Sequence, residues 1–425
     1  MNIIEFGAVN DGITLNTEAI QKAIDKCAEA GGGRVVIPQG KFKSGTIWLK
    51  SNVELHLEMG AELLASDNLD DYNDLDAYEQ NFSILHEEWV GKHLIIAHET
   101  DNSAITGLGK INGNCCAFVT KIPSPVAPWT YYHWNMGISK VNDEVNKRPG
   151  QLICFIECTN VHISDVTIVD SPCWCCFIHG CENVFVRGIR VKNPMWMLNS
   201  DGIDIDASRN VTISDCIIDT GDDGITLRAG EHRIKNKNIH CENVTVTNCV
   251  INSGVCAFRI GVGRGTIKHA RISNITVSKS YAVAQLCTAY SMNPLDKVDI
   301  EDVNFSNISA VDTCRAIEAF AKNGAYLKNI TFENIRSESS MVNLVDGTDG
   351  VVENFNIRNV EIYMGDKYTE LNEDMLARRG TNALKIASAK GVSLENVKIY
   401  GKMVQMEEVA SIEDSTKVYK NNCNF

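Results

Sequence analysis

The sequence has little proline, no excess of positive charge and no long apolar run. Only 8 of its 425 residues are proline, whereas 31 are glycine. Lysine and arginine number 40 against 54 acidic residues, so the net charge is −14. A chain this acidic lacks the field that attracts nucleic acid or anionic lipid. No stretch approaches the roughly 18 uncharged apolar residues of a membrane-spanning helix. We therefore expect neither a nucleic-acid partner nor a membrane partner.

Disorder is excluded as the main state, because 44% of the residues are apolar. The N-terminus, Met1-Asn2-Ile3-Ile4-Glu5, has no basic stretch followed by an apolar segment, as a secretory signal would have. The 16 cysteines lie mostly in apolar segments such as Ile153-Cys154-Phe155, where a thiol behaves as a small hydrophobe. Together these features predict a cytoplasmic protein with reduced thiols.

One cysteine cluster has the spacing of a metal-binding pair. Cys173 and Cys176 are three residues apart, but no second pair or matching histidine pair completes a zinc site. We therefore expect buried structural thiols here, and no metal or other cofactor.

A short phrase recurs along most of the chain. Asparagine or a small polar residue precedes a strand of alternating apolar residues, and a second short strand follows, as in Thr159–Val166, Glu182–Ile189 and Arg209–Cys216. The phrase returns at Val244, Ala270, Val298, Ile330, Phe355 and Val392. Period-two alternation excludes helix, and repeats of irregular length stack as coils with loops of different size. This pattern predicts an all-β fold, a right-handed single-stranded parallel β-helix with about three short strands in each coil.

The predicted coils need a cap and leave room for one long loop. Residues 16–30 read as an N-terminal capping α-helix, with Asn16 as its N-cap and three glycines after it. The repeat weakens over residues 70–150, where Pro128–Trp134 holds four aromatic rings. Such a loop either stacks sugar rings beside a groove or is anchored by its own rings. No Pro-, Ser- or charge-rich linker divides the chain, so residues 1–425 are expected to form one domain.

Three aspartates carry the strongest functional signal. Asn199–Asp206 is followed about one coil later by Gly221–Leu227. Aligning Gly202–Ile205 with Gly224–Leu227 places Asp201 beside Asp223, about 4.8 Å away between coils. Asp201, Asp222 and Asp223 would then share one patch. Like charges this close raise at least one pKa, which keeps one group protonated as an acid while another stays ionised as a base.

Two kinds of chemistry use such a cluster. Glycoside hydrolysis needs one carboxylic acid to protonate the leaving oxygen and one carboxylate to activate water or attack carbon. Calcium binding is the structural alternative, because clustered aspartates on turns can ligate a hard cation. A merely solvated turn is less consistent with adjacent aspartates between glycines at the start of an apolar strand.

The two acidic motifs resemble those of a known family. Asn199-Ser200-Asp201-Gly202 and Gly221-Asp222-Asp223-Gly224 are similar to the Asn-Thr-Asp-Gly and Asp-Asp motifs of glycoside hydrolase family 28, the polygalacturonases and rhamnogalacturonan hydrolases. Further similar segments are Phe6–Gly12, the capping helix, Gly107–Gly113, Arg148-Pro149 and Ser171-Pro172 with Trp174.

The resemblance implies an inverting mechanism without a metal. It implies that Asp222 is the general acid, that Asp201 and Asp223 hold and deprotonate water, and that Asn199 binds sugar or orients the water. Inversion needs carboxyl groups about 6.5–9.5 Å apart, which side chains on adjacent coils can provide.

Two family motifs are absent. Cys256 stands where the family's Gly-His-Gly histidine is expected, and Gln285-Leu286-Cys287 stands near the expected Arg-Ile-Lys. Arg259 and Arg228 are nearby cations that either bind substrate or neutralise the acidic patch. Trp196 is either a sugar platform or a core or loop anchor, and His179 is expected to be structural.

These observations predict a glycoside hydrolase that acts on a pectin-related oligosaccharide. Two alternatives stay open. One is a lyase or epimerase that acts on uronate-containing glycans on the same scaffold, and the other is a carbohydrate-binding β-helix that has lost catalysis. The sequence predicts neither the sugar at the cleaved bond, nor endo or exo action, nor the oligomeric state.

Overall fold

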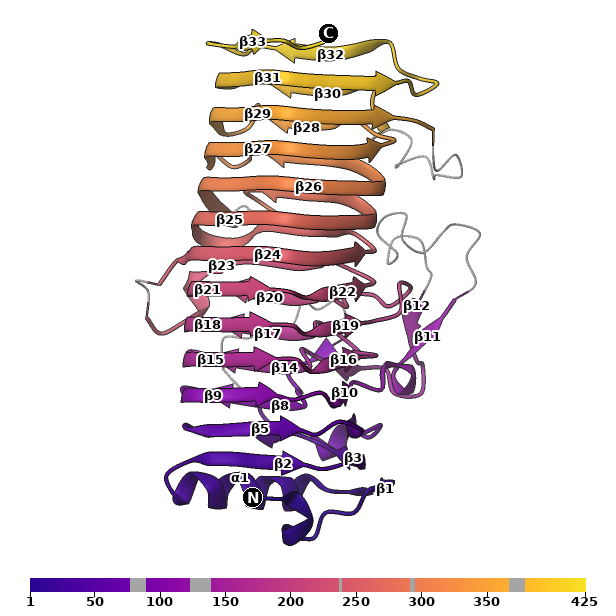
Figure 1. The fold of residues 1–425 in the computed structure, drawn as a ribbon, viewed down its shortest axis with the longest axis vertical. Coiled ribbons are helices and arrows are strands. Elements are labelled where there is room, and N and C mark those ends of the chain that lie inside the picture. Colours follow the sequence, from indigo (N-terminus) through magenta and orange to yellow (C-terminus); the bar gives the residue numbers. More distant parts are fainter. Residues whose placement is uncertain (77–88, 123–138, 237–238, 291–294, 367–378) are drawn as a thin grey trace.

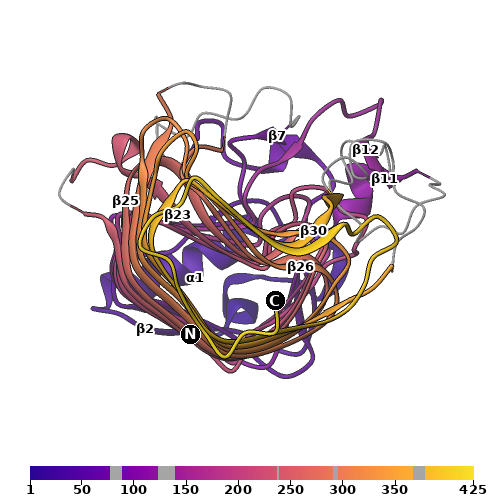
Figure 2. The same ribbon diagram turned by 90° about the horizontal axis from the view of Figure 1, so that it is seen from above.

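The computed structural model describes residues 1–76, 89–122, 139–236, 239–290, 295–366 and 379–425. It confirms a right-handed parallel β-helix. Figure 1 shows the strands stacked in tiers from the indigo N-terminal end to the yellow C-terminal end, and Figure 2 looks along the stack. A single parallel sheet of 29 strands wraps through this stack. The aromatic segment 128–134 lies outside the described residues.

Each coil contributes strands to three faces, as the repeat predicts. The face that carries the aspartates, called the site face, comprises β4 (Ile47–Trp48), β8 (Ile95–His98), β14 (Ile153–Ile156), β17 (Cys176–His179), β20 (Ile203–Asp206), β23 (Ile225–Gly230), parts of β25 (Cys256–Cys287) and β26 (Lys297–Phe320), β28 (Asn343–Asp346), β30 (Asn382–Ala387) and β32 (Glu408–Glu413).

The second face comprises β2 (Gly33–Ile37), β5 (Val53–Leu57), β9 (Asp101–Thr106), β15 (Thr159–Ser164), β18 (Glu182–Arg187), β21 (Arg209–Ser214), β24 (Cys241–Ser253), β27 (Tyr326–Ser339), β29 (Val351–Met364), β31 (Ala389–Gly401) and β33 (Tyr419–Asn421), with the middle of β25 and β26. The third face begins with β1 (Asp11–Leu15), β3 (Gly40–Ser44), β6 (Ala61–Ala65), β10 (Lys110–Asn112), β16 (Thr167–Val169), β19 (Arg190–Lys192) and β22 (Ile217–Thr220). From β24 onward, single long strands bend from the second face into the third.

Short strands and turns lie outside the three faces of the coils, most of them in the loop-rich early part. Strand β7 (Trp89–Val90) pairs with β13 (Arg148–Pro149), and β11 (Val119–Lys121) pairs with β12 (Ser139–Val141). Single 3-10 turns cover Ile3–Phe6, Leu69–Asp71, Cys115–Ala117 and Glu231–Arg233.

The core is a narrow column of stacked side chains. Inward-facing Ile and Val alternate with outward polar residues, and a row of phenylalanines continues the column toward the C-terminal end. Ring centroids are 5.9 Å apart between Phe258 and Phe305, 4.8 Å between Phe305 and Phe332, and 5.8 Å between Phe332 and Phe355. None of the 16 cysteines is in a disulfide, and Cys173, Cys175 and Cys176 are buried, as expected for structural thiols.

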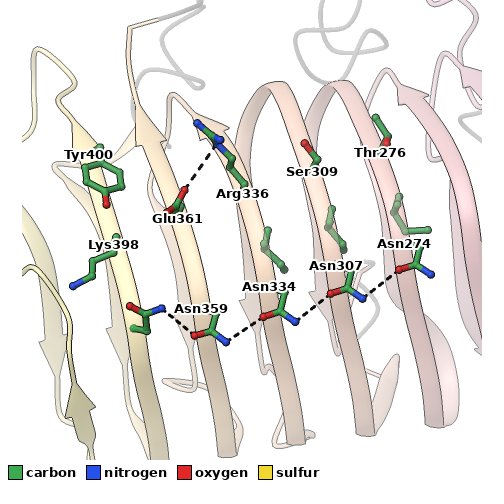
Figure 3. A pocket seen from close by; sticks show the side chains of 14 residues that line it. Asn274, Thr276, Asn307, Ser309, Asn334, Arg336, Asn359, Glu361, Lys398 and Tyr400 are labelled. Carbon is green, nitrogen blue, oxygen red and sulfur yellow. Dashed lines mark hydrogen bonds and ion pairs between the residues drawn. The ribbon is translucent and has the colours of Figure 1, made fainter.

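Asparagines form a ladder along one bend of the coil. Asn274, Asn307, Asn334, Asn359 and Asn396 all have positive φ, between 51° and 57°. Their side-chain amides donate to one another from coil to coil at 3.0–3.2 Å (Figure 3). Asparagine tolerates the left-handed conformation that the bend requires. Asparagine therefore recurs at this bend because it supplies both the backbone conformation and the amide that bridges the coils.

Helix α1 (Thr17–Glu29) covers the N-terminal end of the stack, as predicted (Figure 1). Its buried residues include Ile20, Ile24 and Cys27. Asn16 occupies the N-cap position, as predicted, and its carbonyl accepts from the Ile20 N–H at 3.0 Å. Its side chain, however, makes no capping hydrogen bond; it accepts from the Val9 N–H at 2.7 Å and donates to loop carbonyls. Among the described residues, no helix is long and apolar enough to cross a bilayer.

Candidate active site

The three aspartates converge at the start of two adjacent site-face strands. Ile203 pairs with Ile225 and Asp204 with Thr226, so Asp201 and Asp223 precede matching positions. One oxygen from each of Asp201, Asp222 and Asp223 can be chosen so that all three lie within 4.8 Å of one another. The three side chains are almost buried, with exposed fractions of 3–7%. The nearest oxygens are thus closer than the spacing of about 6.5–9.5 Å expected for an inverting carboxyl pair.

Glycines allow this close approach of the two turns. A Cβ on Gly202 would lie 2.5 Å from the Gly224 carbonyl oxygen, and one on Gly221 would lie 2.1 Å from the Met197 carbonyl oxygen. The backbone is also pinned, because the Gly221 N–H donates to Ser200 Oγ at 2.9 Å. The glycines beside the aspartates are therefore required by backbone packing.

Asp201 is electrostatically the most perturbed member of the triad. Burial raises its pKa well above the ordinary value, and the negative charge of the neighbouring aspartates raises it further. Its Oδ1 atom is buried and has no hydrogen-bond partner within the described part of the chain. Burial and the neighbouring negative charges therefore both favour the protonated form of Asp201.

Asp223 is held by a bidentate ion pair. Arg259 Nε contacts Asp223 Oδ2, and Arg259 Nη2 donates to Asp223 Oδ1 at 3.0 Å. The Cys256 backbone N–H donates to the same Oδ1 at 3.0 Å. Arg259 is only 2% exposed and lies with its guanidinium 4.9 Å from the Tyr290 ring centre. All the described contacts of Arg259 are with the protein, and its charge neutralises that of Asp223, as one of the two sequence alternatives predicts. Direct contact of Arg259 with substrate stays a prediction.

A buried polar network extends beyond Arg259, and the sequence analysis missed it. Arg259 Nη1 donates to Gln285 Oε1, whose Nε2 donates to Glu318 Oε2. Glu318 Oε1 also accepts from Tyr281 Oη at 3.1 Å and from Arg315 Nη1 at 2.5 Å. The repeat register could have indicated this network, because Gln285 and Glu318 continue the row of Arg259 on successive coils.

Arg228 lies at the other end of the same strands. Its Nη1 is 3.4 Å from Asp204 Oδ1, and its guanidinium is 4.2 Å from the Trp174 ring centre. Burial raises the pKa of Asp204 to about 7, against the lowering effect of Arg228. Substrate contact by Arg228 stays a prediction, since its described partners belong to the protein.

Asp206 organises a second buried group on the site face. Burial raises the pKa of Asp206, but His179 and the arginines Arg233 and Arg228 outweigh it and hold the pKa below the ordinary range. Burial lowers the pKa of His179, whose Nδ1 is 3.3 Å from Asp206 Oδ2. His179 also stacks on Phe177, with ring centres 5.2 Å apart. These contacts are those of a structural histidine.

The two remaining candidates are placed differently. Asn199 has positive φ, at 45°, and its Oδ1 accepts from Arg148 Nη2 at 2.6 Å. The fully buried Arg148 also donates to the Leu198 carbonyl at 3.1 Å, so it fixes the loop that carries Asn199. Trp196 is partly buried against an apolar cluster around Met197, as the anchor alternative requires. Its role as a sugar platform stays a prediction.

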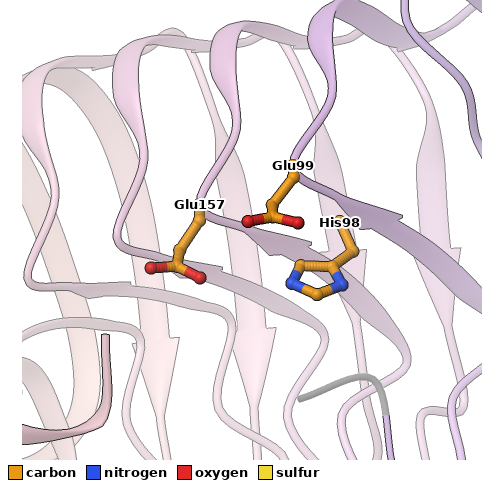
Figure 4. Close-up of side chains that lie close together, drawn as sticks. All are labelled: His98, Glu99 and Glu157. Carbon is orange, nitrogen blue, oxygen red and sulfur yellow. The ribbon is translucent and has the colours of Figure 1, made fainter. Parts of the chain in front are cut away.

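A second cluster of possible metal ligands lies on earlier coils. His98, Glu99 and Glu157 come together there (Figure 4). Lys235 already binds both glutamates: its Nζ contacts Glu99 Oε1, and its backbone N–H donates to Glu157 Oε1 at 2.5 Å. The ammonium group thus supplies the positive charge that a metal would bring.

The comparisons with known proteins identify the family of the chain. Residues 27–379 match the sequence model described as Glycosyl hydrolases family 28. The chain belongs to this family. The exo-poly-alpha-D-galacturonosidase of Dickeya chrysanthemi is 31% identical over 259 residues, which are 54% of this chain and 42% of that protein. The chain therefore matches less than half the length of this relative.

Two solved structures of exopolygalacturonases share the fold. The protein from Yersinia enterocolitica has a TM-score of 0.72 and 21% identity, and the match covers 98% of this chain and 77% of that one. The protein from Thermotoga maritima has a TM-score of 0.63 and 21% identity, with coverage of 95% and 92%.

Proposed function

We propose that the protein hydrolyses a glycosidic bond in a pectin-related oligosaccharide by single displacement with inversion. Asp222 is the general acid, and Asp201 and Asp223 hold and activate the water. The observation that carries the proposal is the buried convergence of three carboxyl groups within 4.8 Å, one of them fixed by Arg259. Membership of family 28 supports the reaction class.

The short oxygen separation is compatible with a shared water. Two oxygens 4.8 Å apart can both bind one water through hydrogen bonds of about 2.8 Å. In this mechanism Asn199, whose Oδ1 accepts from Arg148, orients this water or a sugar hydroxyl. Proton NMR of the products formed at the start of the reaction tests the mechanism. The initial anomer is expected to be inverted, and a retained anomer would instead assign one aspartate as a nucleophile.

Removal of the general acid is the most direct test of the assigned residues. Asp222→Asn is expected to lower kcat about 10²- to 10⁴-fold, because the lost group donates a proton only in the transition state. Asp219→Asn is the matched control, since Asp219 is on nearby β22 and binds Asn252 instead. Activity of Asp222→Asn close to that of the control would reassign the acid.

The alternatives predict other results. A calcium-dependent lyase or epimerase would lose activity on chelation, and a lyase would release unsaturated products that absorb ultraviolet light. A binding protein without catalysis would retain oligosaccharide over a wide substrate panel and release no product. The family match and the complete triad support hydrolysis over both.

A further inference from the structure

Tyr290 lies on a turn that is held firmly against the next coil. Strand β25 crosses the site face twice, first at Arg259 and one coil later at Gln285, and Tyr290 follows the second crossing. Thr288, two residues before Tyr290, is buried. Its hydroxyl accepts from the Lys322 N–H at 2.7 Å and donates to the Lys322 carbonyl at 3.1 Å. The backbone that carries Tyr290 is therefore fixed close to the side chain.

The ring of Tyr290 reaches back one coil and covers Arg259. The centre of the Arg259 guanidinium is 4.9 Å from the ring centre, and the same guanidinium binds both oxygens of Asp223. Arg259 is only 2% exposed. One guanidinium group thus separates the ring from one of the three clustered carboxylates, so the ring borders the place where the cleaved sugar has to lie.

Three arginines of the site face each stack on an aromatic ring, and the three rings differ in exposure. Arg228 lies 4.2 Å from the Trp174 ring centre, and Arg315 lies 5.0 Å from the Tyr281 ring centre. Trp174 is 5% exposed and Tyr281 is 0% exposed, whereas Tyr290 is 43% exposed. A ring that only packs on its arginine is expected to be buried like the first two. The accessible surface of Tyr290 is therefore not explained by its cation–π contact.

An accessible aromatic ring beside a buried polar site is suited to a sugar. One face of a pyranose presents C–H groups and is apolar, so it packs on a flat ring while the hydroxyl groups keep polar partners. The contact involves no charge on the sugar, and it is available to neutral and acidic sugars alike. The fixed turn reduces the conformational entropy that Tyr290 loses when a ligand binds.

We infer that Tyr290 is a substrate-binding residue whose ring stacks on a pyranose ring bound beside Asp223, on the side of the triad toward the C-terminal coils. The inference rests on the proposed function, because it assigns a contact to the substrate of the same site. Tyr290 then has two partners. It packs on Arg259, which holds Asp223, and its accessible surface receives the sugar.

Steady-state kinetics of two variants tests the inference. Tyr290→Ala is expected to raise KM for a cleaved oligosaccharide about 3- to 10-fold, with kcat within about twofold of the unsubstituted protein, because the lost contact is made to the bound sugar. Tyr290→Phe keeps the ring and is expected to leave both constants within about twofold. A KM that is the same in Tyr290→Ala and Tyr290→Phe would overturn the inference.

Tyr400→Ala is the matched control. Tyr400 is 41% exposed and stacks on another aromatic ring, Tyr363, with ring centres 5.1 Å apart, but it lies at the asparagine ladder and not on the site face (Figure 3). Its removal is expected to leave KM and kcat unchanged. An equal rise in KM in Tyr400→Ala and Tyr290→Ala would show a general effect of losing an exposed ring and would contradict the inference.

A purely structural role of Tyr290 predicts a different result. If the ring only keeps Arg259 in place, Tyr290→Ala misplaces Asp223, and kcat falls while KM stays the same. That outcome would overturn the inference. The split between KM and kcat therefore distinguishes contact with the sugar from positioning of Asp223.

Binding without turnover gives a second readout. The probes are trigalacturonate and its carboxyl-reduced form, and calorimetry compares Asp222→Asn with the double variant Asp222→Asn/Tyr290→Ala. Both probes are expected to bind about 3- to 10-fold more weakly to the double variant, because stacking does not depend on charge. A loss confined to the acid would show that the ring acts through the charge of Arg259 and would overturn the inference.

The outcomes separate this inference from the proposed function. Weaker binding of both probes to the double variant, without any turnover by the unsubstituted protein, supports the inference and contradicts the proposed function. Hydrolysis with a KM that Tyr290→Ala does not change overturns the inference and leaves the proposed function standing.

Discussion

Arg259 connects the carboxylate cluster to the next coil of the site face. It reaches across one coil to hold both oxygens of Asp223, and its remaining nitrogen reaches the next coil at Gln285. A planar guanidinium makes this bidentate contact, whereas an ammonium cannot. The position of Asp223 therefore depends on the shape of its partner as well as on the charge.

Arg259→Lys is expected to lower kcat about 10- to 100-fold with a smaller effect on KM, because it misplaces Asp223 without removing a substrate contact. Steady-state kinetics on a cleaved oligosaccharide measures both constants. Arg233→Lys is the control, since Arg233 binds Asp206 and not the triad. A rise in KM with unchanged kcat would show that Arg259 binds substrate instead.

Asp204 makes stability depend on pH. Its pKa is raised from 3.8 to about 7, so the folded protein binds a proton that the unfolded chain releases between these values. The free energy of unfolding therefore falls as pH rises through this window. Asp206 acts in the opposite direction, but its low pKa confines its effect to acid solution.

Asp204→Asn is expected to reduce the fall in melting temperature between about pH 5 and pH 8, because the amide cannot ionise. Melting curves at both pH values measure the difference. The raised pKa of Asp201 leaves a residual fall. A variant with the same pH dependence as the unsubstituted protein would contradict the raised pKa of Asp204.

Residues differ in how well their role could be predicted. Asp201, Asp222 and Asp223 were predicted to meet because adjacent glycines and matching strands fix their register. The contacts of Gln285 and Glu318 were not predicted. Their partners are 26 and 33 positions away in the chain, and common polar residues carry no motif.

At the scale of single elements, the bends of the coil depend on asparagine. Each ladder residue satisfies two demands, a left-handed backbone and an amide that bridges adjacent coils. Alternation predicted the strands well because it follows directly from burial of one face. The cap of α1 was less predictable, because Asn16 found competing carbonyl and N–H partners in the neighbouring loop.

Asn334→Ala is expected to cost about 1–2 kcal/mol of unfolding free energy, since it loses two exposed amide hydrogen bonds and strains a residue with φ of 54°. Asn334→Gly separates the two causes, because glycine adopts this φ without strain. The glycine variant is expected to be the more stable of the two in urea unfolding. Equal stability would mean that backbone strain contributes nothing at this bend.

At the scale of the whole molecule, the stack has unequal ends. The N-terminal end is covered by α1, whereas the last strands, β32 and β33, have no buried residue. Interior coils pair with neighbours on both sides, and terminal coils pair on one side only. Local opening is therefore easiest at the C-terminal end.

Among the strands of the described stack, hydrogen exchange measured by mass spectrometry is expected to be fastest in β32 and β33 and slowest in the interior coils around β20 and β23. The covered strand β2 serves as the internal comparison near the other end. Faster exchange in β2 than in β33 would contradict protection by the helix.

The overall architecture was predictable because it follows from a repeated local pattern. The arrangement of loops was not, because they have no repeat.

The coil pairing that aligns Asp201 with Asp223 has a consequence for how such proteins diversify. Register is set by strand against strand, so a connecting segment can be lengthened, shortened or exchanged at a corner without shifting the reacting groups. The loops that border the bound sugar can thus change while the catalytic residues keep their positions. Loop transplantation between members of the family is for this reason a practical route to new substrate preferences.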